Sequence, residues 1–201
     1  AVPSVLKRAA VEDVITPCGL DSLPRGAVVG TSSIRRGAII RHLRPDIKIE
    51  NIRGNVQTRI RKQEDGEYDA IILAKAGVDR LGLPIRAVTL DPDVFIPAPA
   101  QGAIAMACRK DDQRALDILS KVNHGKTMME VSAERTLMKM MGAGCSSPIG
   151  INAKKTDEGL RIRAITFEYS DEPIVIDKTI PLEYTICDME RISSLLRGES
   201  A

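Results

Sequence analysis

The sequence predicts an α/β domain with a mainly parallel sheet, followed by a smaller α+β domain with an antiparallel three-stranded sheet. Between residues 27 and 81, short apolar runs alternate with segments of helical spacing, the pattern of βαβ units. After residue 148, three alternating segments follow one another, which is typical of an antiparallel sheet. The total of 201 residues suits one large domain or two small ones.

The α/β part opens with an apolar run at 27–30, a polar turn at 31–33 and a helix over 34–43 that ends before Pro45. The next expected elements are a strand over 47–52, a helix over 56–64 that ends at Gly66, a strand over 69–74 and a short helix over 75–81. A crossover segment rich in proline then leads to a strand over 103–108 and a helix over 113–122.

The α+β part begins with an amphipathic helix over 126–141, followed by a loop that contains Cys145. The remaining expected elements are strands over 149–154, 160–167 and 174–180 and a closing helix over 187–196.

The composition excludes several classes of protein. With 43% hydrophobic and 28% charged residues, the chain is an ordinary globular one, and its apolar runs are too short to span a bilayer. The four cysteines are scattered, with no CxxC pair and no histidine cluster. This argues against a disulfide framework and against a metal site, and it favours a reducing cytoplasm.

Positive charge is concentrated in one stretch, although the net charge is only +2. Nine basic residues lie between Arg35 and Lys62, against two acidic ones. Such a concentration favours a polyanionic ligand, with a solvated basic face as the alternative. Nucleic acid is disfavoured, because the stretch holds no aromatic residue on which bases would stack.

A polar turn gives this charge a candidate site. Thr31, Ser32 and Ser33 come where a strand meets a helix N-terminus, and Arg35 and Arg36 follow one turn later. Free N–H groups, hydroxyls and guanidinium groups together bind anions. The alternative is a simple helix N-cap by Thr31 or Ser32.

Further arginines are expected at the same edge of the sheet. Arg53 and Arg59 follow the neighbouring strand, and Arg80 follows the next strand and its short helix. Because the carboxyl ends of parallel strands open on one crevice, we expect these side chains to converge on one anion.

Cys145 is the second candidate. Gly142 and Gly144 flank it in a loop, which leaves a thiol accessible for covalent chemistry. The alternative is a small buried hydrophobic residue.

Several motifs resemble the hydroxymethylbilane synthase (porphobilinogen deaminase) family in order and spacing. They are Val29–Arg36, Ile52–Arg59, Asp65–Ala74, Gln101–Ala103, Ala133–Arg135 and Gly144–Gly150. The resemblance implies a transferase that condenses four porphobilinogen units head to tail, with release of ammonia, into hydroxymethylbilane in haem biosynthesis. It also implies a dipyrromethane cofactor, bound through a thioether to Cys145. A non-catalytic α/β domain that binds a small polyanion remains the alternative.

The resemblance also implies roles for the candidate residues. The cofactor-binding residues would be Cys145, Arg35, Arg36, Ser33 and Thr31, and the substrate-binding residues would be Arg53, Arg59, Arg80, Ser32 and Gln101. The family places a catalytic aspartate in a motif that this sequence does not contain, so no catalytic residue is assigned. Ala100 stands where the family commonly has glycine.

The resemblance implies a three-domain protein. Two of its α/β domains would resemble periplasmic binding proteins, and a smaller α+β domain would carry the cysteine. On that pattern, residues 1–10 are a remnant of the first domain, 11–95 the second domain, 96–122 a crossover belonging to the first, and 123–201 the cysteine domain. Most of the first domain is then expected to precede Ala1, and this chain alone is expected to be inactive. The complete protein is expected to be a cytoplasmic monomer without a nucleic-acid or membrane partner.

Overall fold

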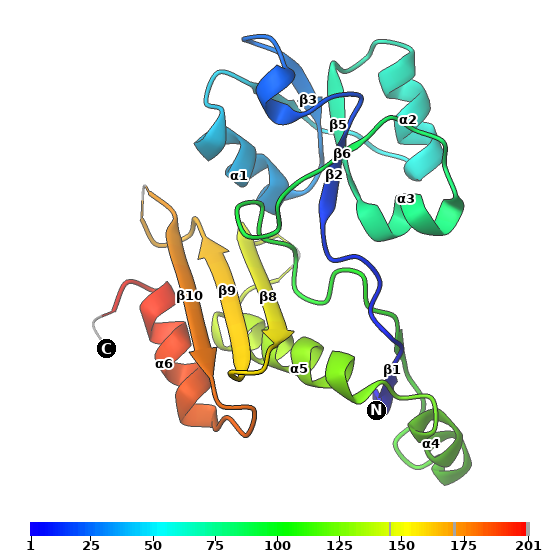
Figure 1. The fold of residues 1–201 in the computed structure, drawn as a ribbon, viewed down its shortest axis with the longest axis vertical. Helices are drawn as coiled ribbons and strands as arrows, with labels where there is room; N and C mark the ends of the chain where they lie inside the picture. Colours follow the sequence, from blue (N-terminus) through cyan, green and yellow to red (C-terminus); the bar gives the residue numbers. More distant parts are fainter. Residues whose placement is uncertain (145, 171, 200–201) are drawn as a thin grey trace.

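The chain forms a five-stranded sheet, a three-stranded sheet and a two-stranded ribbon, in a computed structural model that describes residues 1–144, 146–170 and 172–199 (Figure 1). The strands are β1 (Ser4–Val5), β2 (Asp13–Thr16), β3 (Val28–Gly30), β4 (Lys48–Glu50), β5 (Ala70–Ala74), β6 (Val88–Thr89), β7 (Ala105–Met106), β8 (Ile149–Lys155), β9 (Leu160–Thr166) and β10 (Ile174–Ile180). The helices are the 3₁₀ turn η1 (Leu20–Ser22), α1 (Ile34–Leu43), α2 (Val56–Glu64), α3 (Lys75–Leu81), α4 (Gln113–Ser120), α5 (Gly125–Met140) and α6 (Ile186–Leu196).

The five-stranded sheet has the order β4-β3-β5-β2-β6. Strands β4, β3 and β5 are parallel, whereas β2 is antiparallel to both of its neighbours. Four of the five strands therefore point the same way, and the predicted mainly parallel sheet is confirmed. The strands β2 and β6 were not predicted, because they are short and carry no periodic pattern of their own.

Helices cover both faces of this sheet (Figure 1). Strand β5 shows why, since its residues alternate between two cores. Ile72 packs in the core that contains Ile39 and Ile40 of α1, whereas Ile71 and Leu73 pack in the core beneath α2 and α3. The central strand is thus buried on both sides, as expected for a parallel sheet.

The second sheet has the order β10-β9-β8 and is antiparallel throughout. Leu137 of α5 and Ile192 of α6 pack with Ile151 and Ile162 of the sheet in one core. The predicted smaller α+β domain with an antiparallel three-stranded sheet is confirmed. No helix of the described residues has both the length and the apolar character needed to cross a bilayer.

The N-terminal segment lies beside residues that are far away in sequence. Strand β1 pairs antiparallel with β7, with Ser4 opposite Met106 and Val5 opposite Ala105. The strand expected over 103–108 is shorter than predicted and spans only Ala105–Met106. The domain division drawn from the sequence stays a prediction.

Ala100 is the single non-glycine residue with a positive φ, +62°, in the part of the chain that the structure describes. Its N–H donates to Glu134 Oε2 over 2.6 Å, so a buried carboxylate holds the left-handed turn. A left-handed conformation costs a residue with a Cβ about 1–3 kcal/mol.

Replacing Ala100 by glycine is expected to raise the free energy of unfolding by about 1 kcal/mol. Glycine removes the strain and keeps the N–H, and the gain exceeds the ~0.5–1 kcal/mol of extra chain entropy. Urea unfolding measures the difference. Ala98→Gly is the control, because Ala98 has no positive φ and its replacement should destabilise the chain. A similar loss in both variants would contradict the assigned strain.

Candidate functional site

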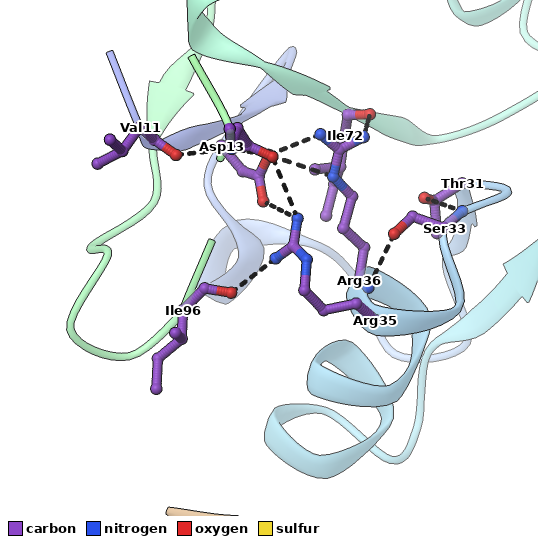
Figure 2. A network of polar contacts seen from close by, with 9 residues as sticks. Val11, Asp13, Thr31, Ser33, Arg35, Arg36, Ile72 and Ile96 are labelled. Atoms are coloured by element: carbon purple, nitrogen blue, oxygen red, sulfur yellow. Dashed lines mark hydrogen bonds and ion pairs between the residues drawn. The ribbon is translucent and has the colours of Figure 1, made fainter. Parts of the chain in front are cut away.

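The candidate site is built around Asp13, the first residue of β2, whose side chain is fully buried. Arg35 Nη2 donates to Asp13 Oδ2 over 2.7 Å, and Arg36 Nη2 donates to Asp13 Oδ1 over 2.6 Å. Figure 2 shows both guanidinium groups reaching this carboxylate from the first turn of α1. The two arginines predicted from the sequence therefore lie together, joined by an aspartate.

Each guanidinium group is fixed by further contacts. Arg35 Nη1 donates to the Ile96 carbonyl oxygen over 2.8 Å, and its guanidinium lies 5.8 Å from the ring centre of Phe95. Arg36 Nη1 donates to the Ile72 carbonyl oxygen over 3.2 Å. These contacts come from two separate segments, so the arginine pair is held in one place.

Gln101 completes the arrangement. Its Nε2 donates to Asp13 Oδ1 over 3.0 Å and to the Val11 carbonyl oxygen over 2.6 Å. Its Oε1 accepts a long bond of 3.5 Å from Arg35 Nη2. The Gln101 amide thus contacts Asp13 directly, and its predicted contact with substrate stays a prediction.

The cluster carries more positive than negative charge. Two guanidinium groups, 5% and 11% exposed in their side chains, face one carboxylate. Burial raises the pKa of Asp13, but Arg36 and Arg35 lower it by more, so its pKa lies below the usual value. Arg35 Nε is buried and has no hydrogen-bond partner among the described residues. An excess buried cation and an unused donor both favour a bound anion.

The hydroxyl groups of the polar turn have local partners. Ser33 is the N-cap of α1 and accepts from the Arg36 N–H over 3.4 Å, so the alternative interpretation, a cap at Thr31 or Ser32, placed the cap one or two residues too early. Thr31 Oγ1 accepts from the Ser33 N–H. Ser32 Oγ donates to the Ile52 carbonyl oxygen and accepts from its N–H, which joins this turn to the segment that follows β4.

The other predicted arginines do not take part in the contacts around Asp13. Arg53 and Arg80 are exposed. Arg59 Nε donates to the Gly54 carbonyl oxygen over 2.8 Å, so its side chain folds back on its own turn. The structure thus brings together Arg35, Arg36 and Gln101. A common ligand for the remaining arginines stays a prediction.

Cys145 lies outside the described residues, between the end of α5 and the start of β8. Its predicted role therefore stays a prediction.

A cavity of about 510 Å³ lies elsewhere, between the segment 7–12 and the C-terminal domain. Its lining includes Lys7, Glu130, Lys154 and Arg163, and does not include Asp13 or the two arginines. This cavity and the charged cluster are therefore separate features.

Asp13 was missed as a site residue. The sequence offered only a weak signal, a charged residue directly before the β-branched run 14–16, and the structure shows that every residue of this strand is buried. A buried carboxylate requires a partner, and in the structure Arg35 and Arg36 of the arginine-rich stretch supply it.

Comparisons with known proteins decide the family. Residues 1–117 match the family described as "Porphobilinogen deaminase, dipyromethane cofactor binding domain", and residues 128–185 match "Porphobilinogen deaminase, C-terminal domain". The chain belongs to the porphobilinogen deaminase family. The predicted family and fold class are confirmed, and with them a domain for the dipyrromethane cofactor.

A probable porphobilinogen deaminase of Nitrosopumilus maritimus is 42% identical over 164 residues, which are 80% of this chain and 53% of that protein. The chain thus spans about half the length of this curated relative. A solved chain from work on glutathione import and a cystine importer of Streptococcus mutans shares 13% identity at a TM-score of 0.36. The matched region covers 69% of this chain and 58% of the solved chain.

The two family matches divide the candidate residues. Arg35, Arg36 and Gln101 fall in the region named for cofactor binding, whereas Cys145 falls in the region that matches the C-terminal domain. The region that carries the cofactor name is therefore the one that contains the charged cluster.

Proposed function

We propose that this chain is the part of a hydroxymethylbilane synthase that binds the dipyrromethane cofactor and the growing polypyrrole. The reaction condenses four porphobilinogen units head to tail and releases ammonia, in tetrapyrrole biosynthesis. The observation that carries the proposal is the excess positive charge of the buried Arg35–Arg36–Asp13 cluster inside the cofactor-binding domain. The complete enzyme is proposed to be a cytoplasmic monomer.

The cluster suits the chemistry of these molecules. Each pyrrole carries an acetate and a propionate group, so cofactor and product are polycarboxylates. Arginine forks bind carboxylates in pairs of hydrogen bonds. Arg36 donates from Nη1 to the Ile72 carbonyl oxygen and from Nη2 and Nε to Asp13 Oδ1, which leaves one N–H on each terminal nitrogen. The buried Nε of Arg35 also has no partner among the described residues. These remaining donors would hold one carboxylate, with Thr31 and Ser33 shaping the turn.

Asp13 is proposed to orient the arginines rather than to transfer protons. Oδ1 accepts from Arg36 and Gln101, and Oδ2 accepts from Arg35. With these donors and a lowered pKa, the carboxylate remains ionised near neutral pH. A group of this kind fixes charge and geometry, and a general acid for the departing amine requires a different residue.

Cys145 is proposed as the covalent attachment point. When bound, the cofactor supplies the pyrrole carbon from which the product grows. The thioether at Cys145 would hold one end of this chain of pyrroles, while Arg35 and Arg36 bind its carboxylates. Arg53, Arg59, Arg80 and Ser32 are proposed to meet the carboxylates of later units. Family membership does not favour the alternative of a polyanion-binding domain without catalysis.

Replacing Arg36 by leucine is expected to weaken the binding of porphobilinogen by about 1.5–3 kcal/mol, the range for a hydrogen bond to a charged group. Isothermal titration calorimetry of the purified chain measures the change.

Arg41→Leu is the matched control, because Arg41 is exposed on the same helix. Arg44 belongs to the same basic stretch but is unsuitable as a control, because its guanidinium group donates hydrogen bonds to Asp46 and to the Leu20 carbonyl oxygen. Equal losses in Arg36→Leu and Arg41→Leu would indicate a diffuse basic surface and would contradict the proposed site.

A further inference from the structure

Glu134 is a fully buried carboxylate on α5, in the C-terminal domain. Arg8 Nη1 donates to its Oε1 over 2.7 Å, and Arg8 Nη2 donates to its Oε2 over 3.0 Å. Three more donors surround it: the N–H groups of Ala100 and Ala153, at 2.6 and 2.8 Å, and Asn152 Nδ2, at 3.2 Å. All five partners are hydrogen-bond donors, so both carboxylate oxygens are in use. Burial raises the pKa of Glu134, whereas Arg8 and the N–H groups of Ala100 and Ala153 act in the opposite direction and favour the ionised form.

Arg8 extends this contact toward the charged cluster. Its Nε donates to the Gln101 carbonyl oxygen over 2.9 Å, while both terminal nitrogens remain on Glu134. Glu134 is therefore connected to the turn at 100–101 in two ways. It accepts directly from the Ala100 N–H, and it binds Arg8, which in turn donates to the Gln101 carbonyl oxygen. The backbone of Gln101 is fixed by these two contacts.

The same turn is pressed against the N-terminal segment. A Cβ at Gly102, where φ is +78°, would lie 2.4 Å from the Ala10 carbonyl oxygen. The Ala9 N–H also donates to the Gly102 carbonyl oxygen over 2.9 Å. A turn in a strained, closely packed conformation keeps its shape only where its surroundings hold it. Glu134 is the buried charge that does so.

From Gln101 the contacts reach the arginines. The Gln101 side chain donates to Asp13 Oδ1, and Asp13 accepts from both Arg35 and Arg36. One unbroken series of hydrogen bonds thus leads from α5 through Arg8 and Gln101 to the ligand-binding arginines.

We propose that Glu134 is a positioning residue for the anion site, acting through Arg8 and Gln101 on Asp13 and hence on Arg36. The inference rests on the proposed function for its ligand but concerns a residue outside the arginine cluster. Because Glu134 lies in the matched range 128–185 and Arg8, Gln101 and Asp13 lie in the range 1–117, the same series joins the two family regions in one network.

The first test replaces Glu134 by glutamine, with Glu158→Gln on the exposed β8–β9 turn as the control. Glu134→Gln is expected to weaken porphobilinogen binding about tenfold, the loss typical of one broken link in a coupled network. Heteronuclear NMR of the arginine Nε–H groups supplies a readout that needs no ligand. The Arg36 signal, assigned by its absence in Arg36→Lys, is expected to move in Glu134→Gln and not in Glu158→Gln.

The second test is a double-mutant cycle with Gln101→Met, which removes the amide but keeps the side-chain length. If Glu134 acts through Gln101, adding Glu134→Gln to Gln101→Met changes the affinity less than twofold. Losses that multiply would show a general structural role and overturn the proposal.

Arg8→Lys keeps the positive charge but loses the paired guanidinium hydrogen bonds to Glu134. It provides a milder variant if Glu134→Gln does not fold. An unchanged Arg36 signal and unchanged affinity in Arg8→Lys would also overturn the proposal. Failure of the unmodified chain to bind porphobilinogen would count against the proposed function instead, and the Arg36 signal would then test the positioning role by itself.

Discussion

Asp13→Asn is expected to lower the free energy of unfolding by about 3–5 kcal/mol at neutral pH, the range for removing one partner of a buried ion pair. The side chain keeps its shape, but Arg35 and Arg36 lose the carboxylate that compensates their charge. Asparagine also turns an N–H₂ group toward donors. Urea unfolding monitored by circular dichroism measures the effect. Asp157→Asn, at an exposed position, should change stability by less than about 0.5 kcal/mol.

The stability difference between the parent chain and Asp13→Asn is expected to depend on pH. The pKa of Asp13 is lower in the folded chain than its usual value of 3.8. Its contribution to stability is therefore complete above pH 3.8 and is lost as the pH falls toward the folded-state pKa. The difference between the parent chain and Asp13→Asn should stay constant from pH 7 to about pH 5 and narrow below about pH 3.8. A difference that is already lost between pH 7 and pH 5 would show that Asp13 is not the group responsible.

Cys145→Ser is expected to abolish both the covalent cofactor and the turnover of porphobilinogen in the assembled enzyme. A serine hydroxyl at neutral pH is a far weaker nucleophile than a thiolate, so no stable link to the pyrrole carbon forms. Intact mass and peptide mapping locate the adduct, and trapping of hydroxymethylbilane as uroporphyrin measures the activity.

Cys108→Ser serves as the matched control, because Cys108 is a partly buried free thiol that is predicted to take no part in the reaction. This variant should retain the adduct and the activity. An adduct found on Cys18, Cys108 or Cys187 would contradict the assignment.

The long elements of the fold could be predicted from the sequence because their periodicity is local. The helix over 34–43 and the strands β8 to β10 follow directly from apolar spacing. Strand β2 has four residues, all buried, and so gives no alternation to read. It is recognisable as a strand only through its pairing with β5 and β6.

The candidate site divides in the same way. Arg35 and Arg36 were predictable, because clustered arginines after a strand indicate an anion site whatever the tertiary structure. The role of Asp13 was not, since it depends on contacts with residues 22 and 23 positions away. The polar turn was correctly placed, yet its hydroxyls serve as an N-cap and a link to the segment that follows β4, which hydroxyl groups at helix starts often do.

The residues that contact Asp13 and Glu134 are far apart in sequence, and this distance affects the order in which the protein folds. Gln101 meets Asp13 across 88 positions, and Arg8 meets Glu134 across 126. Bringing such distant segments together costs loop entropy that only a largely formed structure repays. Helix α1, which carries the two arginines, can form early from local contacts. The hydrogen bonds to the carboxylates that orient these arginines form last. Changes to Asp13, Gln101 or Glu134 will then mainly accelerate unfolding and leave the folding rate almost untouched.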